Sequence, residues 1–271
     1  MPIDVMTEKD RVTLPTRLQR RPRSAVFAVL LLMLLAAPLS AFAGQLTVAA
    51  AASLTDAFKE IGRKFEAARP GITVRFNFAA SGLLIQQIVQ GAPVDVFVSA
   101  DQETMNRGIE RKVIDADSRR DFATNSVVLV TAADGGPAIA SLGDLQGSVV
   151  KRIAVGKVAT VPVGRYTKQA LVSAGLWAPL EPKFVQADSV RQVLDYVARG
   201  EAEAGFVYRT DASIMSDKVR IALTVDGHAP VRYPVAVVSD SRQKTVARDF
   251  AAYLTTPAVQ EVLGRFGFGR P

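Results

Sequence analysis

The sequence predicts an α/β protein with two lobes, each a mainly parallel sheet flanked by helices, joined by two crossover strands that act as a hinge. Apolar strands alternate with amphipathic helices after residue 43, a pattern typical of parallel sheets. The alternation breaks off after an apolar strand near residue 126 and restarts, and another long apolar strand follows near residue 235. Two lobes joined in this way enclose a cleft, where ligands commonly bind.

Residues 1–43 have the pattern of a secretory signal peptide. Arginines precede the apolar run over residues 25–37, and the small residues Ala41-Phe42-Ala43 follow it. The apolar run is shorter than the roughly 20 residues that a membrane span needs. We therefore expect cleavage after Ala43 and a periplasmic mature protein. Whether export uses the general secretory or the twin-arginine route stays open.

Composition narrows the class of protein. The chain has no cysteine, so neither a disulfide scaffold nor a lipid anchor on a processed cysteine is expected. Residues 1–43 hold six of the 33 basic and three of the 26 acidic residues, which leaves 27 against 23, or +4, in the rest of the chain. These charges are scattered and do not interleave with aromatic residues, so nucleic-acid binding is not expected.

The expected elements follow the chain in order. The first lobe is expected over 44–125 and 234–271, where hydrophobic periodicity predicts strands at 46–49, 72–78 and 94–98. It also predicts a helix with Leu54, Phe58, Ile61 and Phe65 on one face and a helix over 83–90. A further helix is capped by Asp101, and a final helix carries Val246, Phe250 and Tyr253. In the second lobe, over 126–233, it predicts strands at 125–130, 152–155, 183–185 and 205–208 and helices over 164–174 and 189–199, with the strand over 231–238 leading back.

Two serines stand in the same local setting, directly after an apolar strand and at the start of a helix. They are Ser53, in Ala-Ala-Ala-Ala-Ser-Leu-Thr-Asp, and Ser81, in Ala-Ala-Ser-Gly-Leu. A helix N-terminus attracts anions because unpaired N–H groups and the positive dipole end converge there. Capping alone also explains such a serine, and Asp56 has capping-box spacing to Ser53. Gly82 is costly inside a helix and indicates that something approaches its backbone closely.

Three more candidate donors lie in the second lobe. The N–H of Val163 follows Pro162 at a helix start, where Gly164 adds conformational freedom, and the N–H of Val190 follows Ser189, which has capping-box spacing to Gln192. Tyr208 ends a strand, where ligands of α/β sheets tend to bind. A plain loop, a capped helix or a core tyrosine explains each position equally well when it is taken alone.

The chain lacks the usual signatures of an enzyme. His228 is the only histidine and lies in a turn-like segment, and there is no Gly-x-Ser-x-Gly elbow or Gly-rich phosphate loop. No cluster of histidine and carboxylate residues has metal-ligand spacing. We therefore expect a binding protein without catalytic residues, cofactor or direct metal ligands.

From Gln45 onward, the chain resembles the periplasmic molybdate-binding proteins of ABC transporters, a branch of the type 2 solute-binding proteins. The segments that carry the resemblance are Ala-Ala-Ala-Ser-Leu-Thr-Asp-Ala-Phe at 50–58, Ala-Ser-Gly at 80–82, Asp-Val-Phe-Val-Ser-Ala-Asp at 95–101, Val-Pro-Val-Gly-Arg-Tyr at 161–166, Ser-Val-Arg at 189–191, Gly-Glu-Ala at 200–202, Val-Tyr at 207–208 and Tyr-Pro-Val-Ala at 233–236. The resemblance implies the two-lobed type 2 periplasmic binding-protein fold.

The resemblance also implies a ligand and the atoms that hold it. A tetrahedral dianion, molybdate or tungstate, would contact Ser53, Ser81, the N–H groups of Val163 and Val190, and Tyr208, through its oxygens and not through the metal. The partner would be an inner-membrane ABC permease, and the protein a monomer. Because neutral donors and helix dipoles suffice for such an anion, Arg165 and Arg191 are expected to point outward. Sulfate, thiosulfate and ferric iron stay open as other ligands of this fold.

Overall fold

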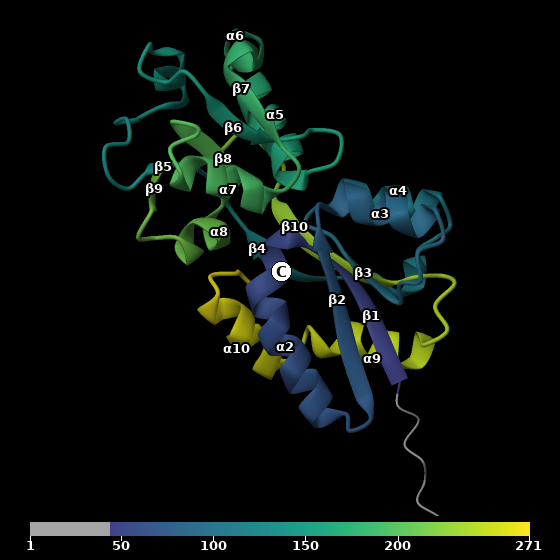
Figure 1. Cartoon of the computed structure of the whole chain (residues 1–271). Coiled ribbons are helices and arrows are strands. Elements are labelled where there is room, and N and C mark those ends of the chain that lie inside the picture. Colours follow the sequence, from purple (N-terminus) through teal and green to yellow (C-terminus); the bar gives the residue numbers. More distant parts are fainter. Residues whose placement is uncertain (1–43) are drawn as a thin grey trace, which may run out of the picture. The chain divides into compact units, whose positions relative to one another are not determined.

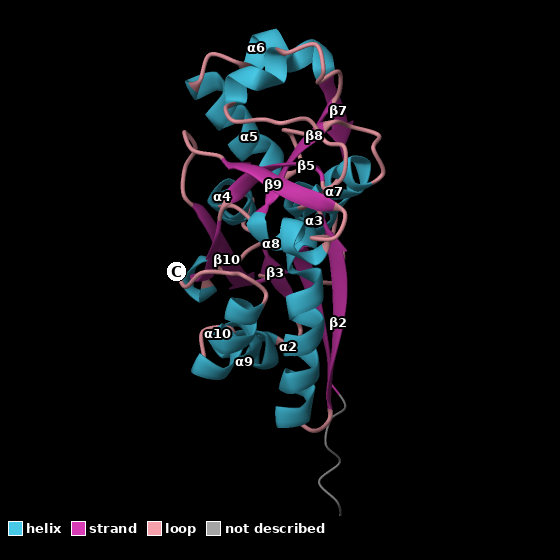
Figure 2. Cartoon of the chain, turned by 90° about the vertical axis from the view of Figure 1, so that its left-hand side faces the viewer, coloured by secondary structure: helices cyan, strands magenta, loops and turns pink. Residues whose placement is uncertain are grey.

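The computed structural model describes residues 44–271, so the signal peptide expected over residues 1–43 lies outside the described residues. This part of the chain forms two five-stranded sheets, each flanked by helices (Figure 1, Figure 2). The expected α/β architecture is therefore confirmed. None of the helices described here is both long and apolar enough to cross a membrane.

The first sheet has the strand order β2-β1-β3-β10-β4. Its strands are β1 (Gly44–Ala51), β2 (Ile72–Ala79), β3 (Val96–Val98), β4 (Arg120–Asn125) and β10 (Val231–Val237). β1 pairs in parallel with β2 and β3, while β10 is antiparallel to β3 and to β4. Only β10 therefore runs against its neighbours.

The second sheet repeats this plan with the order β7-β6-β8-β5-β9. Its strands are β5 (Val127–Ala132), β6 (Ile153–Gly156), β7 (Phe184–Ala187), β8 (Ala204–Tyr208) and β9 (Val219–Thr224). β6 pairs in parallel with β7 and β8, and β5 is antiparallel to β8 and β9. In both sheets the reversed strand takes the fourth place, next to the edge.

Helices cover both faces of the first sheet. The helical elements of this lobe are η1 (Ala52–Leu54), α2 (Thr55–Ala68), α3 (Ser81–Val89), α4 (Gln102–Glu110), η2 (Ala116–Ser118), α9 (Lys244–Tyr253) and α10 (Pro257–Arg265). Alternate residues of β1 point to opposite faces. Leu46 and Val48 join the core under α2, α9 and α10, whereas Ala49 joins a separate cluster with Leu84 and Met105 of α3 and α4.

The second sheet is flanked in the same way by the remaining helices. These are η3 (Leu142–Gln146), α5 (Pro162–Ser173), α6 (Trp177–Leu180), η4 (Glu181–Lys183), α7 (Val190–Ala198) and α8 (Arg209–Ile214). Val193, Leu194 and Val197 of α7 are buried in the core, as the expected apolar face of a helix over 189–199 requires. This packing fixes the N-terminus of α7 at the end of the sheet that faces the first lobe (Figure 1).

The chain crosses between the sheets at two places. β4 ends at Asn125 and β5 begins at Val127, so the strand expected over 125–130 corresponds to β5, and Ser126 separates it from β4. The return runs from β9 to β10, which pairs only with strands of the first sheet. The domain boundary expected between residues 233 and 234 therefore falls inside β10.

Several elements were not expected from the sequence, among them β4, β9 and α10 and the short helices α6 and α8. β4 and β9 are edge strands with mixed exposed and buried residues, so they lack the continuous apolar run that identified the central strands. α10 begins at Pro257, which is common at the first turn of a helix but reads as a break in a periodic pattern. The elements that were expected are all present, with ends shifted by a few residues.

Candidate functional site

A small cavity lies between the lobes, at the carboxyl ends of the central parallel strands of the first sheet. Its lining residues are Ala51, Ala52, Ser53, Ala79, Ala80, Ser81, Ala100, Val161, Pro162, Val163, Val190 and Tyr208. All five residues expected to contact a ligand are among them. The space open to the centre of a water-sized sphere is about 10 Å³, roughly what one water molecule needs. An organic solute does not fit, which leaves small inorganic ions as candidates.

The lining of this cavity carries hydrogen-bonding groups but no charged side chains. It contains no carboxylate and no cationic side chain, and alanine and valine make up most of its surface. The polar groups among the lining residues include the hydroxyls of Ser53, Ser81 and Tyr208, which can donate and accept hydrogen bonds, and the main-chain N–H groups of Val163 and Val190, which donate. A small anion that accepts at every oxygen fits such a lining, whereas a metal cation finds no charged ligand there.

A larger hollow of about 480 Å³ lies at the other end of β1, around Gln45, Asp95 and Ser241. The carboxylate of Asp95, one of the two that line it, is already occupied, because Asp95 accepts from the N–H of Thr47 at 2.8 Å and from Ser241 Oγ at 2.7 Å. It is also at the amino ends of the parallel strands, where ligands of α/β sheets seldom bind. The small cavity is therefore the better candidate.

Ser53 is placed in the cavity by a short 3₁₀ turn and not by helix capping. It lies within η1, and the N-cap position of α2 falls on Leu54, without a side-chain cap. The expected capping box between Ser53 and Asp56 is therefore wrong. Instead, Ser53 is 3% exposed and its Oγ lies 3.0 Å from Oη of Tyr233. The hydroxyl is held by tertiary contacts at the cavity wall.

Ser81 begins α3 and is fully buried. Ala80 occupies the N-cap position, and Ser81 Oγ accepts a hydrogen bond from the N–H of Ala100 at 3.1 Å. Gly82 donates its N–H to the carbonyl of Thr160 in the second lobe at 2.9 Å, and a Cβ on Gly82 would lie 2.6 Å from that carbonyl oxygen. The close approach expected at Gly82 is therefore confirmed, and the approaching group is the main chain of the other lobe.

The N–H groups of Val163 and Val190 are available at the N-termini of two helices. Val163 is the second residue of α5 and Val190 the first of α7, so neither has an acceptor within its own helix. Among the described residues, neither N–H donates to any protein acceptor. Ser189 caps α7 by accepting from the N–H of Gln192 at 3.2 Å, as its spacing predicted. Both helices thus offer a main-chain donor to the cavity.

Gly164 serves a different purpose from the one expected. A Cβ at this position would overlap the carbonyl of Gly156 at the end of β6. The glycine therefore lets α5 approach the sheet closely, and it does not act through a special backbone conformation. This close packing places the first turn of α5 at the cavity.

Tyr208 reaches across the cavity from the end of β8. Its ring is 1% exposed, and its Oη donates to the carbonyl of Ala100 in the first lobe at 3.5 Å, a long hydrogen bond. Burial raises the pKa of Tyr208 well above its usual value, so the phenol keeps its proton. Tyr208 is therefore a neutral donor.

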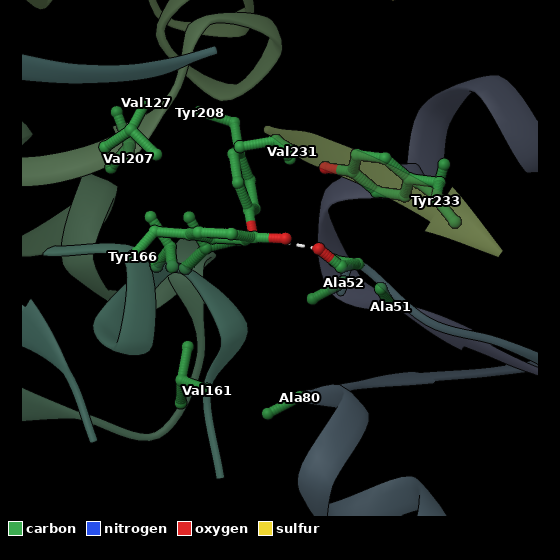
Figure 3. Packing of buried hydrophobic residues seen from close by; sticks show 14 of the residues in the cluster. Ala51, Ala52, Ala80, Val127, Val161, Tyr166, Val207, Tyr208, Val231 and Tyr233 are labelled. Atoms are coloured by element: carbon green, nitrogen blue, oxygen red, sulfur yellow. Dashed lines mark hydrogen bonds between the residues drawn. The ribbon is translucent and has the colours of Figure 1, made fainter. Parts of the chain in front are cut away.

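Two residues behind Ser53 were missed from the sequence. The ring of Tyr233 packs edge-on against Tyr208, with centroids 5.9 Å apart (Figure 3), and its Oη also accepts from Nδ2 of Asn125 at 3.3 Å. Tyr233 lies in an apolar strand and reads as a core tyrosine. A phenol in a crossover strand is the one available signal, because a buried Tyr hydroxyl needs a partner.

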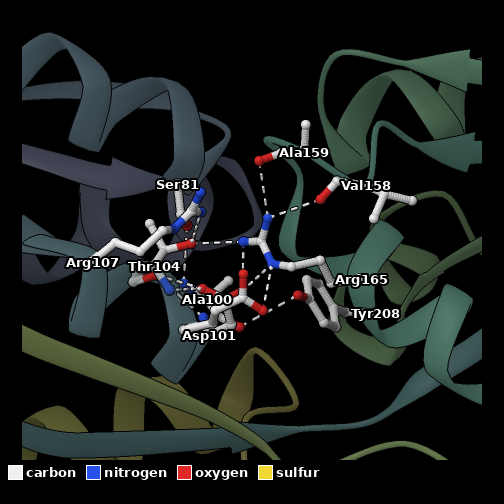
Figure 4. Close-up of polar contacts among 11 residues, drawn as sticks. Ser81, Ala100, Asp101, Thr104, Arg107, Val158, Ala159, Arg165 and Tyr208 are labelled. Atoms are coloured by element: carbon white, nitrogen blue, oxygen red, sulfur yellow. Dashed lines mark hydrogen bonds and ion pairs between the residues drawn. The ribbon is translucent and has the colours of Figure 1, made fainter.

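Arg165 does not point outward, contrary to expectation. It is 7% exposed, and its guanidinium lies 2.5 Å from Oδ2 of Asp101 in the first lobe (Figure 4). It also donates to Thr104 Oγ1 at 2.6 Å and to the carbonyl of Val158 at 3.0 Å. The carboxylate draws it inward: Asp101 caps α4, as predicted, with one oxygen and receives Arg165 with the other. Arg165 therefore ties the lobes together without lining the cavity.

Arg191 forms a second bridge and is likewise not turned away. Its guanidinium lies 2.6 Å from Oδ1 of Asp211 in its own lobe and 2.9 Å from Oδ2 of Asp56 in the first lobe. Asp211 is fully buried, and this burial raises the pKa of its carboxyl to about 6 despite the arginine. Arg191 also approaches the carbonyl of Ser53 at 3.4 Å.

Comparison with known proteins agrees with this geometry. The family model described as bacterial extracellular solute-binding protein matches residues 46–269. The molybdate-binding protein ModA of Escherichia coli is 40% identical over 236 residues, which cover 83% of this chain and 89% of that protein.

Two solved structures share the fold. The periplasmic molybdate-binding protein of Azotobacter vinelandii aligns with a TM-score of 0.72 at 24% identity, over 83% of this chain and 99% of that one. The sulfate-binding protein SubI of Mycobacterium tuberculosis aligns with a TM-score of 0.74 at 16% identity, over 83% and 86%. These likenesses confirm the two-lobed periplasmic binding-protein fold. Together with the family match, they show that the chain belongs to the bacterial extracellular solute-binding proteins.

Proposed function

We propose that this protein captures molybdate, or the closely similar tungstate, between its lobes and delivers it to an ABC permease. The observation that carries the proposal is the lining of the cavity, which offers hydroxyls and main-chain N–H groups as donors and no charged side chain. The 40% identity to a protein named as molybdate-binding supports the choice of ligand.

The donor set favours a tetrahedral dianion without a proton. Molybdate carries no proton at neutral pH, so each of its oxygens accepts. Hydrogen phosphate would bring an O–H into a lining without a carboxylate acceptor, which leaves that donor unpaired at a cost of about 1–3 kcal/mol. Two negative charges are balanced here by N–H dipoles at the starts of α5 and α7 and by hydroxyls. Sulfate has the same charge and shape, so selection against it rests on size.

The proposed role is binding without catalysis. The ligand's oxygens would meet Ser53, Ser81, Val163, Val190 and Tyr208, with no direct bond from protein to metal and no cofactor. We expect the mature protein to be a periplasmic monomer after removal of residues 1–43.

Closure of the lobes would signal the bound ligand to the permease. Donors from both lobes line the cavity, so an open form satisfies only part of the anion's oxygens. The contacts of Arg165 with Asp101 and of Gly82 with Thr160 describe the closed arrangement. Small-angle scattering should show a smaller radius of gyration with molybdate than without. The same radius in both states would rule out closure as the signal.

Calorimetric titration of the mature protein tests the choice of ligand. We expect tight binding of molybdate and tungstate, and at least about 100-fold weaker binding of sulfate, a difference of roughly 2.7 kcal/mol. Thiosulfate and phosphate serve as further competitors. Equal affinity for sulfate and molybdate would contradict selection by size, and tight binding of phosphate would contradict a site that presents its hydroxyls and N–H groups as donors.

A further inference from the structure

A chain of hydrogen bonds runs from the crossover of the lobes to Ser53. Asn125, at the end of β4, places Nδ2 3.3 Å from Oη of Tyr233 in β10, and this Oη lies 3.0 Å from Ser53 Oγ. Tyr233 is fully buried, and it does not line the cavity, whereas Ser53 does. Asn125 and Tyr233 therefore stand behind the proposed ligand contact and not in it.

The donor and acceptor in these hydrogen bonds are fixed at Asn125. Asn125 Oδ1 accepts from the N–H of Ser126 at 2.9 Å, so its other terminal atom must be the donating Nδ2. Nδ2 donates to Thr210 Oγ1 at 2.9 Å and to Tyr233 Oη. Tyr233 Oη accepts from Asn125, and its buried phenol proton needs an acceptor of its own. Among the described residues, Ser53 Oγ is the one within reach.

Either hydroxyl of this 3.0 Å contact can donate, but only donation by Tyr233 to Ser53 Oγ gives the buried phenol proton an acceptor among the described residues. In that arrangement the proton of Ser53 is free to point into the cavity. Ser81 Oγ likewise accepts a hydrogen bond from the protein, in this case from the main-chain N–H of Ala100. Both serines thus have an oxygen occupied by a protein donor and a proton left for the ligand. At Ser81 a main-chain group sets this orientation, and at Ser53 two side chains set it.

We propose that Tyr233, oriented by Asn125, is a positioning residue that holds Ser53 as a hydrogen-bond donor toward the oxyanion and so helps the site reject protonated oxyanions. The inference deepens the proposed function and rests on it. Without the phenol proton, Ser53 Oγ is free to rotate and to accept a hydrogen bond. It would then lose part of its bond to a fully deprotonated anion and tolerate an anion that carries an O–H.

The variant Tyr233→Phe removes the hydroxyl and keeps the ring, whose edge-on contacts with Phe122 and Phe268 hold it in the core. We expect the Kd for molybdate to rise about 3- to 10-fold, the range for one hydrogen bond. The ratio of the phosphate Kd to the molybdate Kd should fall. Tyr253→Phe, on a half-buried tyrosine of α9, is the matched control and should change neither value.

A double-mutant cycle separates positioning from a general structural effect. In a Ser53→Ala background, Tyr233→Phe should change the molybdate Kd less than 2-fold, because the serine through which it acts is gone. An equal loss in both backgrounds, or no loss in either, would overturn the proposal. If Tyr233→Phe fails to fold, Asn125→Ala replaces it in the same cycle, with an expected 2- to 4-fold loss that also disappears without Ser53.

The wild-type titration keeps this inference apart from the proposed function. If the wild type binds sulfate in place of molybdate, the proposed ligand is wrong, and the same four Kd values measured with sulfate decide the role of Tyr233. If the wild type binds none of the tetrahedral anions, both proposals fail. A cycle without coupling in a protein that binds molybdate contradicts the role of Tyr233 alone.

Discussion

The two lobes meet the cavity with different chemical groups. The first lobe presents the hydroxyls of Ser53 and Ser81, whereas the second presents the main-chain N–H groups of Val163 and Val190 together with the phenol of Tyr208. A hydroxyl is lost with a single substitution, but a main-chain N–H survives every substitution except proline. The identity of the side chain therefore matters at the donors of the first lobe and much less at Val163 and Val190.

The ion pairs that join the two lobes near the cavity also divide by charge between the lobes. The carboxylates of Asp56 and Asp101 belong to the first lobe, and the guanidiniums of Arg165 and Arg191 to the second. Each arginine closely follows one of the main-chain donors in the sequence. The second lobe thus supplies the main-chain donors for the ligand and also the positive charges that pair with carboxylates of the first lobe.

The largest effect is expected from removing Arg165. In Arg165→Ala the carboxylate of Asp101 is left buried and unpaired in the closed form, which should weaken molybdate binding by on the order of 3 kcal/mol, about 150-fold. Adding Asp101→Asn should restore much of the affinity, because asparagine still caps α4 and carries no charge. Calorimetry on the three proteins measures this. Unchanged affinity in the single variant would show that the bridge does not favour closure.

The two serines come next. Ser53→Ala and Ser81→Ala should each weaken molybdate binding by about 1.5–3 kcal/mol, the range for a hydrogen bond to a charged group. Ser81→Ala should also destabilise the ligand-free protein by about 1–3 kcal/mol, because the buried N–H of Ala100 loses its acceptor. Exposed Ser213→Ala on α8 is the control. A variant that binds normally but unfolds early would reduce that serine to a structural role.

The buried carboxyl beside the second bridge predicts a dependence of stability on pH. The pKa of Asp211 is raised to about 6 from 3.8, so the folded protein holds this proton more tightly than the unfolded chain. The group therefore costs stability above pH 6, and this cost disappears as the pH falls from 6 toward 4.

Urea unfolding of the wild type and of Asp211→Asn at pH 7 and pH 4.5 measures this contribution of Asp211 to the unfolding free energy. When the pH is lowered from 7 to 4.5, the unfolding free energy of the wild type should rise by about 2 kcal/mol relative to that of Asp211→Asn. Carboxyls with lowered pKa values, such as Asp115 and Asp144, act in the opposite direction but cancel in the difference. Parallel pH profiles for the two proteins would contradict the role of Asp211.

The smallest effect separates main-chain from side-chain donors. Val190 is the first residue of α7, where proline is tolerated and removes the N–H along with the buried valine side chain. Val190→Pro should weaken molybdate binding by about 1.5 kcal/mol, whereas Val190→Ala, which keeps the N–H, should bind within about 3-fold of the wild type. Equal affinities for the proline and alanine variants would remove this N–H from the set of donors.

The features that were predicted correctly depend on residues close together in the sequence. The order of strands and helices, the caps at Asp101 and Ser189, and the close approach at Gly82 follow from propensity, capping chemistry and sterics within a few residues. The meeting of the five expected contacts in one cavity followed from the resemblance together with helix ends and strand ends. Their role as ligands stays a prediction.

Long-range pairing was out of reach of the sequence. Tyr233 and Ser53 are 180 residues apart, and Arg165 lies 64 residues from Asp101, so no spacing indicates either contact. The cap expected at Ser53 failed because a 3₁₀ turn over Ala52–Leu54 moves the N-cap position of α2 to Leu54. The two arginines looked like surface residues because nothing local shows that a carboxylate in the other lobe receives them.

A crystal structure of the mature protein with molybdate tests the central claim most directly. The account predicts one anion in the small cavity, with its oxygens within hydrogen-bond distance of Ser53 Oγ, Ser81 Oγ, Tyr208 Oη and the main-chain nitrogens of Val163 and Val190. The ion pairs of Arg165 with Asp101 and of Arg191 with Asp56 should remain closed around it. An anion bound directly by either guanidinium, or bound outside this cavity, would contradict the account.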